Sequence, residues 1–293
     1  MTNADDAANP HTRAPHRPMH VARTVPDLRR TVAALPRPLA LVPTMGALHA
    51  GHVALVDEAR RRAATCCTSI FVNPLQFGPT EDLARYPRDE AGDLARLDAA
   101  GCGLVWMPSV EAMYPPDAAT TVEVGGPTEG FEGAARPGHF RGVATVVLKL
   151  LHQVGPDVAL FGEKDWQQLQ VVRRMAADLD LPVEIAGVPT VREPDGLALS
   201  SRNRFLSPGE RAAAPRLFAA LRSVAARIAG GEAVADALRS GRDALRDAGL
   251  APDYLDLVEA ATMRPQREWC PPARLVAAAR LGTVRLLDNV PVP

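Results

Sequence analysis

The sequence predicts an α/β protein with a doubly wound parallel sheet, followed by a second, smaller α+β domain at the C-terminus. Between residues 38 and 191, short apolar runs alternate with segments whose apolar residues recur at helical spacing. Buried strands that alternate with helices are typical of a parallel sheet. After about residue 191 the alternation stops. Two helical segments then precede three strand-like runs joined by short turns, which indicates antiparallel pairing.

Each element follows from apolar spacing and from local capping signals. Ser207 and Glu210 form a capping-box pattern with Pro208 at the first helical position, so a helix begins there and runs toward residue 229. A second helix is expected at 231–248. In the first domain the expected strands are 38–45, 66–72, 103–109, 157–162 and 183–191, the intervening helices are 52–64, 91–101, 142–154 and 165–179, and the C-terminal strands are 253–260, 274–282 and 283–290.

Length and composition predict three regions and exclude several classes of protein. We expect a disordered tail at 1–20, a first domain at 21–190 and a second at 191–293, because 293 residues suit two unequal domains. The formal net charge of −1 gives no reason to expect nucleic acid or an anionic membrane as a partner. There is no apolar run near the roughly 18 residues of a membrane span, and the first residues lack the apolar core of a signal peptide. We therefore expect a cytoplasmic protein.

The four cysteines, at positions 66, 67, 102 and 270, show no CxxC spacing. Three of them lie in or beside apolar strand-like segments. In a reducing compartment we expect buried thiols rather than disulfides or a zinc site.

Two histidines lie where the first buried strand ends. His49 and His52 are two of only seven His in the chain, and Gly51 lies between them. A helix is expected to begin at or just after His52, and the unpaired amides and positive dipole end of such a helix bind anions. The imidazoles could donate hydrogen bonds to phosphate oxygens. The alternative is that the two His only complete a turn. An HxGH motif directly after a buried strand favours a functional role for them.

A second strand-to-helix junction carries a lysine. The stretch FGEKD follows the strand 157–162, and Asp165 could serve equally as a helix N-cap or as a ligand-binding residue. The positive charge of Lys164 interacts unfavourably with the positive end of the helix dipole. A bound polyphosphate would make a positive charge favourable at this position. Because 31 of the 33 basic residues are Arg, a retained Lys indicates a need for a compact ammonium. Lys149, the other Lys, lies in an apolar helical segment that its aliphatic stem can cover.

Further polar residues suit a nucleotide and a small substrate. The stretch LSSRN (199–203), near the predicted domain junction, supplies two hydroxyls and an Arg for a phosphate clamp. Gln76 and Gln168 could bind hydroxyls and a carboxylate, although Gln is by default a surface residue. The sequence has no GxxxxGKS, GxxxxGKT or GxGxxG motif. Because no Ser or Cys stands in a nucleophile motif, a covalent enzyme intermediate is not indicated.

Several longer blocks together resemble the pantoate–β-alanine ligase (pantothenate synthetase) family. In family order they are PTMGALHAGH, SIFVNPLQF, DLARYPRD, EGAARPGHFRGV, FGEKDWQQL and GVPTVREPDGLALSSRN, and the later LVAAARLGTVRLLDN resembles the family's ending. The HxGH motif alone is shared with nucleotidyltransferases and class I aminoacyl-tRNA synthetases, but its combination with NPLQF, GEKDWQQ and LSSRN is specific. The resemblance implies a Rossmann-like fold of the nucleotidyltransferase type, with the C-terminal domain as a lid.

The resemblance implies an ATP-dependent ligase that works in two steps. The carboxylate of pantoate attacks the α-phosphate of ATP and gives pantoyl adenylate and pyrophosphate. β-Alanine then attacks the adenylate and gives pantothenate and AMP. This agrees with the residue pattern, because adenylation creates a good leaving group, and the enzyme need only position the reactants and stabilise charge.

The resemblance also implies which residues contact ATP. His49, His52 and Lys164 would meet the phosphates, His52 would also be the proton donor, and Arg202 would clamp the triphosphate. These four are the expected catalytic residues. Val191 would contact adenine through its backbone. The full implied ATP-binding set is Met45, Gly46, Ala47, Leu48, His49, Ala50, Gly51, His52, Gly162, Glu163, Lys164, Asp165, Val191, Leu199, Ser200, Ser201 and Arg202.

Substrate, metal and assembly are implied in the same way. Gln76 and Gln168 would hold pantoate, with Gln76 also near β-alanine. Mg²⁺ would accompany ATP, and Asp93 is the acidic candidate ligand, although Gly92 stands where some relatives place a second acid. Trp166 replaces a more usual Tyr or Phe. A homodimer is the implied assembly.

Two other functions would use some of the same residues. A nucleotidyltransferase that joins AMP to a phosphorylated metabolite would share the histidine motif and the sheet, but would require neither the Gln pair nor the LSSRN segment. A non-catalytic ATP-binding module would need only to sense nucleotide. The complete set of phosphate-directed His, Lys and Arg argues against such a non-catalytic module.

Overall fold

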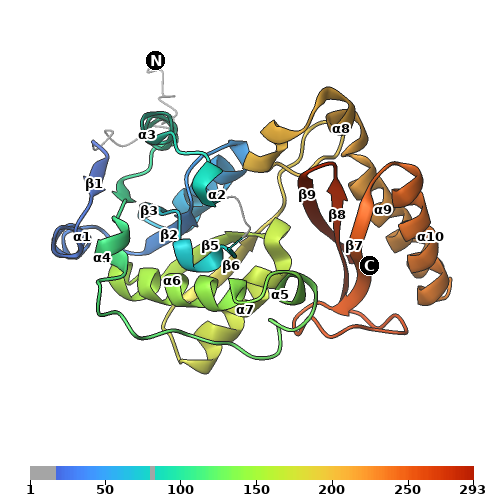
Figure 1. Cartoon of the computed structure of the whole chain (residues 1–293). Helices are drawn as coiled ribbons and strands as arrows, with labels where there is room; N and C mark the ends of the chain where they lie inside the picture. The colour runs from blue at the N-terminus through green and yellow to red at the C-terminus, as the bar shows by residue number, and fades with distance from the viewer. Residues whose placement is uncertain (1–17, 80–82) are drawn as a thin grey trace, which may run out of the picture.

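The computed structural model describes residues 18–79 and 83–293, which form two parts side by side (Figure 1). The larger part has a six-stranded parallel sheet, and the smaller has a three-stranded antiparallel sheet. The predicted fold class is therefore confirmed. The predicted tail, residues 1–20, falls mainly on residues 1–17, outside the described residues, and His20 already begins a strand.

The strand order of the parallel sheet creates a crevice at its centre. The order is β1–β4–β3–β2–β5–β6, so the chain builds outward from β2 in one direction and from β5 in the other. In open α/β sheets ligands bind outside the carboxyl ends of the strands, where the order reverses. Here that place lies between β2 and β5. The strands are β1 (His20–Ala22), β2 (Leu39–Thr44), β3 (Thr65–Ile70), β4 (Leu104–Trp106), β5 (Val158–Gly162) and β6 (Glu184–Val188).

The central strands are apolar on both faces because helices cover both. Leu39 and Leu41 of β2 belong to one core cluster, Ala40 and Val42 to the other, and all four are fully buried. Alternate residues of a strand point to opposite faces, which explains this division. Residues of α1 (Val25–Ala33), α6 (His139–Val154) and α7 (Trp166–Asp178) complete the first cluster, and residues of α2 (Ala50–Arg62) and α3 (Glu90–Ala99) complete the second.

The C-terminal part has a core of its own. Its sheet has the order β7–β8–β9, with antiparallel pairing throughout, and the apolar faces of two helices pack against it. The predicted capping box of Ser207 and Glu210 is confirmed, with both reciprocal hydrogen bonds present. The elements are α8 (Pro208–Ala213), α9 (Arg216–Ala229), α10 (Val234–Asp247), β7 (Ala251–Glu259), β8 (Ala273–Leu281) and β9 (Val284–Val292).

Several boundaries differ from the prediction. The helix expected at 52–64 begins at Ala50, because the side chain of His49 accepts a backbone hydrogen bond and acts as the N-cap. The strand expected to reach residue 191 ends at Val188. The helix expected from residue 208 toward 229 is divided into α8 and α9 at Ala214 and Pro215. Four of the α-helices and strands were not predicted, and each has nine residues or fewer. They are β1, α1, α4 (Val110–Met113) and α5 (Phe131–Ala135).

All four cysteines are free thiols, and three of them, Cys66, Cys67 and Cys102, are buried as expected. Cys270 is exposed. Among the described residues, none of the helices combines the length and the apolar character needed to cross a membrane.

Candidate active site

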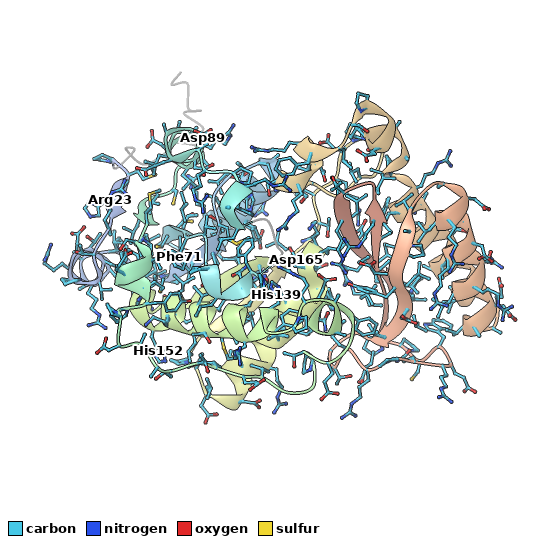
Figure 2. The ribbon with its side chains drawn as sticks, viewed as in Figure 1. Arg23, Phe71, Asp89, His139, His152 and Asp165 are labelled. Atoms are coloured by element: carbon cyan, nitrogen blue, oxygen red, sulfur yellow. The ribbon has the colours of Figure 1, made fainter. Side chains whose placement is uncertain are left out.

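A cavity of about 300 Å³ lies at the carboxyl ends of β2 and β5, where the strand order reverses. The parallel sheet forms one side of it, and residues of the C-terminal part, including Leu286 and Asn289, line the other. Figure 2 shows His139 and Asp165 near the centre of the molecule, on the side of the larger part that faces the C-terminal part. Most of the predicted site residues line this one cavity, namely Met45, His49, Gly51, His52, Gln76, Gly162, Lys164, Asp165, Gln168, Val191, Leu199, Ser200, Ser201 and Arg202.

The two imidazoles of the HxGH motif form one unit at the start of α2. Their ring centroids are 4.1 Å apart. The Nδ1 atom of His49 accepts from the amide of Gly51 at 3.1 Å, and the Nδ1 atom of His52 accepts from the amide of His49 at 3.3 Å. An Nδ1 atom that accepts a hydrogen bond carries no proton, so each neutral ring carries its proton on Nε2. Both histidines are therefore hydrogen-bond donors through Nε2.

Burial keeps both rings neutral. It lowers the pKa of His52 to about 3, and the neighbouring His49 and Lys164 contribute to the same shift. Burial, followed by the positive charges of Lys164 and Arg204, lowers the pKa of His49 to about 4. At neutral pH the pair thus offers two N–H dipoles without net charge. Before a ligand binds, the positive charge of this end of the cavity comes from lysine and arginine.

Gly51 allows this arrangement because it has no side chain. A Cβ atom at this position would lie 2.9 Å from Cε1 of His49 and 3.0 Å from its Nδ1. The ring of His49 therefore folds back over the first turn of α2 only because position 51 is glycine. The glycine in the motif thus makes room for the His49 ring.

Asp93, the predicted Mg²⁺ ligand, is hydrogen-bonded to the loop before His49. Its carboxylate accepts from the amides of Ala47 at 2.8 Å and Leu48 at 2.7 Å, and the residue is 1% exposed. Ala47 has a left-handed backbone (φ 51°), as does Gly46 (φ 79°), so the carboxylate stabilises an unusual loop. Asp93 does not line the cavity. The structure thus gives no support to the predicted Mg²⁺ ligand and makes Asp93 an anchor of the loop before His49.

The remaining loop residues of the predicted ATP set also lie behind the cavity wall. Gly46, Ala47, Leu48 and Ala50 shape the turn between β2 and α2 but do not line the cavity. Nor does Glu163, whose carboxylate pairs with Arg274 at 3.0 Å. These positions support the site from outside.

Lys164 and Asp165 enter the cavity from a tight turn. The 3₁₀ turn η3 (Glu163–Asp165) joins β5 directly to α7, and the Nζ atom of Lys164 lies 3.7 Å from Oδ1 of Asp165. Asp165 occupies the N-cap position of α7 without making a side-chain capping bond. Its carboxylate lines the cavity beside the Lys164 ammonium instead of capping α7.

The LSSRN segment lines the same cavity as Lys164. Its residues form the 3₁₀ helix η4 (Ser201–Phe205), which Ser200 caps by accepting from the amide of Arg202. The amide of Leu199 donates to the carbonyl of Val191 at 3.0 Å, so the clamp segment and the predicted adenine contact are fixed to each other. The guanidinium of Arg202 lies 5.9 Å from the ring of Tyr86.

The amide end of the cavity contains residues that were not predicted from the sequence. Gln76 is buried at the end of the 3₁₀ turn η1 (Pro74–Gln76), and its Oε1 accepts from Nδ2 of Asn73 at 3.1 Å. Its carbonyl lies 2.9 Å from Nδ1 of His139 and 3.4 Å from Nη2 of Arg136. Asn73, Arg136 and His139 all line the cavity. These residues belong to the NPLQF and ARPGH motifs, whose polar side chains could have suggested a binding site. The motifs alone do not predict which of these side chains are in contact.

The described residues offer no ready-made metal site. Within 18–79 and 83–293, no three His, Cys, Asp or Glu side chains are grouped so as to hold a metal ion.

The chain is similar to known proteins over nearly its whole length. A sequence profile described as Pantoate-beta-alanine ligase matches residues 20–291. The chain belongs to the pantoate–β-alanine ligase family. Pantothenate synthetase of Acidiphilium cryptum is 59% identical over 94% of this chain and all of that protein. Pantothenate synthetase of Rhizorhabdus wittichii is 58% identical over 94% of this chain and 99% of that protein.

Solved structures of the pantoate–β-alanine ligase family share the whole architecture. Pantothenate synthetase from Thermus thermophilus is 53% identical, with a TM-score of 0.89, over 94% of this chain and 99% of that one. Pantoate-beta-alanine ligase from Francisella tularensis is 30% identical, with a TM-score of 0.80, over 94% and 98% of the two chains. The Francisella structure is described as complexed with Beta-gamma ATP and Beta-alanine.

Proposed function

We propose that this enzyme condenses pantoate with β-alanine, using ATP, and forms pantothenate, AMP and pyrophosphate through pantoyl adenylate. The observation that carries the proposal is that one cavity joins two chemically different ends. Imidazole N–H groups, an ammonium and a guanidinium serve phosphates at one end. At the other end, neutral amides with the Arg136 guanidinium beside them suit the hydroxyls and carboxylate of pantoate.

In the first step a carboxylate oxygen of pantoate attacks the α-phosphorus of ATP. The new P–O bond forms as the bond to pyrophosphate breaks, and pyrophosphate leaves with the electron pair. Negative charge grows on the phosphate oxygens, where preorganised donors contribute most. We assign these donors to the Nε2–H groups of His49 and His52, to Lys164, and to the hydroxyls and guanidinium of the Ser200–Arg202 segment.

This assignment changes the expected role of His52. With a pKa of about 3, its ring is almost never an imidazolium at pH 7, so it donates a hydrogen bond from a neutral ring. The first step needs no proton, because a carboxylate attacks and pyrophosphate departs as an anion. The cationic charge is supplied by Lys164 and Arg202.

In the second step the free amine of β-alanine attacks the acyl carbon of the adenylate. The amide C–N bond forms, the bond to the AMP oxygen breaks, and the nitrogen loses its surplus proton to solvent. We propose that Gln76 and Gln168 hold pantoate through both steps. His139 and Arg136 keep the Gln76 backbone in place.

Adenine would lie against the Val191 backbone, and Mg²⁺ would enter with the ATP phosphates. We further propose a cytoplasmic homodimer. The family membership supports this proposal, and light scattering on the purified chain would test the dimer.

The decisive assay measures AMP and pantothenate while ATP, pantoate and β-alanine are omitted in turn. Formation of both products should require all three substrates at steady state. Pyrophosphate release with ATP and pantoate alone should reach one equivalent per site. Nucleotide turnover that is independent of pantoate would instead favour a nucleotidyltransferase, and ATP binding without turnover would favour a sensing module.

A further inference from the structure

Asn289 of β9 contacts the turn that carries Lys164. Its Nδ2 group donates to the carbonyl of Glu163 at 2.9 Å and to the carbonyl of Lys164 at 2.8 Å. The side chain is 3% exposed, so these bonds are shielded from water. No side chain caps η3 at its N-terminus. The two carbonyls of this turn are thus held by a residue 125 positions away in the sequence.

The chemistry of its neighbours determines how the Asn289 amide is oriented. Its Oδ1 accepts from Nε of Arg274, and a guanidinium can only donate. Its Nδ2 faces two carbonyls, which can only accept. The amide therefore has one satisfying orientation. An aspartate in this place would keep the contact with Arg274 and turn a carboxylate oxygen against two carbonyl oxygens.

The same arginine fixes the other side of the turn. Arg274 pairs with the carboxylate of Glu163 at 3.0 Å, and its guanidinium lies 3.6 Å from the centroid of the Trp166 ring. The indole Nε1 of Trp166 donates to the carbonyl of Ala260 at 2.8 Å. Residues before and after Lys164 are thus held by the C-terminal part, and the Lys164 carbonyl itself is bound by Asn289.

We propose that Asn289 is a positioning residue for Lys164, which places the Lys164 ammonium at the phosphate end of the cavity once the C-terminal sheet has docked on η3. The turn is only three residues long, so a shift of its carbonyls moves the base of the lysine side chain. The C-terminal sheet thereby positions the positive charge at the phosphate end of the cavity, while Lys164 of the larger part carries that charge. This inference rests on the proposed function, in which Lys164 stabilises phosphate charge.

The test is a double-mutant cycle between positions 289 and 164, measured as single-turnover formation of pantoyl adenylate. Asn289→Asp should lower this rate by about 100-fold, the effect of a misplacement of about 1 Å in a catalytic site. The KM for pantoate should change less than about twofold, because that end of the cavity is untouched. In a Lys164→Ala background, Asn289→Asp should have almost no further effect, since its consequence passes through the lysine.

Asn289→Ala keeps the test independent of the added charge. It removes the same two donors without introducing a carboxylate, so it too should lose its effect when Lys164 is absent. Trp166→Phe is the matched control, because it removes one hydrogen bond from the same interface and leaves both Asn289 donors in place. It should lower the adenylation rate far less than either Asn289 variant. Circular dichroism and a melting curve would establish that each variant is folded.

Equal losses from the Asn289 variants with and without Lys164 would overturn the inference, and so would a wild-type rate in folded Asn289→Ala. If the wild-type enzyme formed no pantoyl adenylate, the proposed function itself would fail. If the wild-type enzyme and the Asn289 variants all formed pantoyl adenylate at the same high rate, only the positioning role would be overturned.

Discussion

Gly142 of α6 packs directly against the carbonyl of Leu75. A Cβ atom at position 142 would lie 2.2 Å from that oxygen, and the Gly142 carbonyl accepts from Nδ2 of Asn73 at 3.1 Å. The helix and the turn that carries Gln76 are thus in backbone contact. The position of Gln76 in the cavity depends on the absence of a single methyl group.

Gly142→Ala should therefore displace the Gln76 turn. Overpacking of this kind costs about 1–3 kcal/mol of unfolding free energy. We expect a higher KM for pantoate and a smaller change in the KM for ATP. The displaced residue is the proposed pantoate ligand, and its contact with the proposed ATP set is with Sδ of Met45, 3.3 Å from Nε2 of Gln76. Steady-state kinetics and urea unfolding would measure both effects. An unchanged pantoate KM would show that the turn does not hold the substrate.

His52→Ala should slow pantoyl adenylate formation by about 100- to 1000-fold, the usual effect of removing one preorganised donor. The fold should persist, because His52 lies at the cavity rather than in an apolar cluster. Single-turnover pyrophosphate release would measure the rate, and circular dichroism the fold. An unfolded variant with full activity per folded molecule would show that the ring serves structure instead.

Lys164→Arg should lose at least about tenfold in the adenylation rate, or about 1.4 kcal/mol of transition-state stabilisation. A guanidinium keeps the charge but spreads it over a planar group that does not reproduce a compact ammonium. Lys149→Arg is the matched control, since that residue lies on α6 outside the cavity lining. Wild-type ATP kinetics in Lys164→Arg would refute the argument drawn from the scarcity of lysine.

Asp93→Asn should destabilise the protein by about 1–3 kcal/mol, because a buried backbone amide loses its acceptor. The Mg²⁺ concentration that gives half-maximal activity should not change, since both carboxylate oxygens are occupied by backbone amides. A magnesium titration of the variant decides the question. A large shift toward higher Mg²⁺ would restore the role that the sequence predicted for Asp93.

Stability should fall in acid because of the histidine pair. Both pKa values are depressed from 6.5 in the folded protein, so below pH 6.5 the unfolded chain takes up protons that the folded protein does not. For His52 the loss is at most about 1.4 kcal/mol per pH unit, and it ends near pH 3, where the folded protein also binds the proton. His52→Gln should show a shallower decline between pH 6.5 and 4 in chemical unfolding. Parallel curves would contradict the depressed pKa.

Much of the site was accessible from the sequence because its signals are local. The HxGH motif follows a strand of six residues, and FGEKD follows another, so the end of each strand marks where its polar residues must emerge. Parallel strands bring such ends to one edge of the sheet. The functional interpretation of Lys164 and the two Gln followed from the same reasoning and from the family resemblance.

What escaped prediction depends on contacts between distant segments. Asp93 was expected to bind metal, but it lies where its carboxylate meets the amides of Ala47 and Leu48, 46 and 45 positions earlier. Asn73 and His139 belong to quoted motifs, but their link through Gln76 arises only when α6 packs against η1. A local sequence pattern does not predict contacts between segments that are distant in the sequence.

The sequence alone determined the fold class, the strand-end motifs and the family, because apolar periodicity and motif spacing are properties of neighbouring residues. The tertiary structure decided which polar atoms are already hydrogen-bonded within the protein. It made His49 and His52 neutral Nε2–H donors through burial and backbone hydrogen bonds. It also placed Asn289 on the carbonyls of the Lys164 turn, a contact that exists only because two sheets with separate cores meet there.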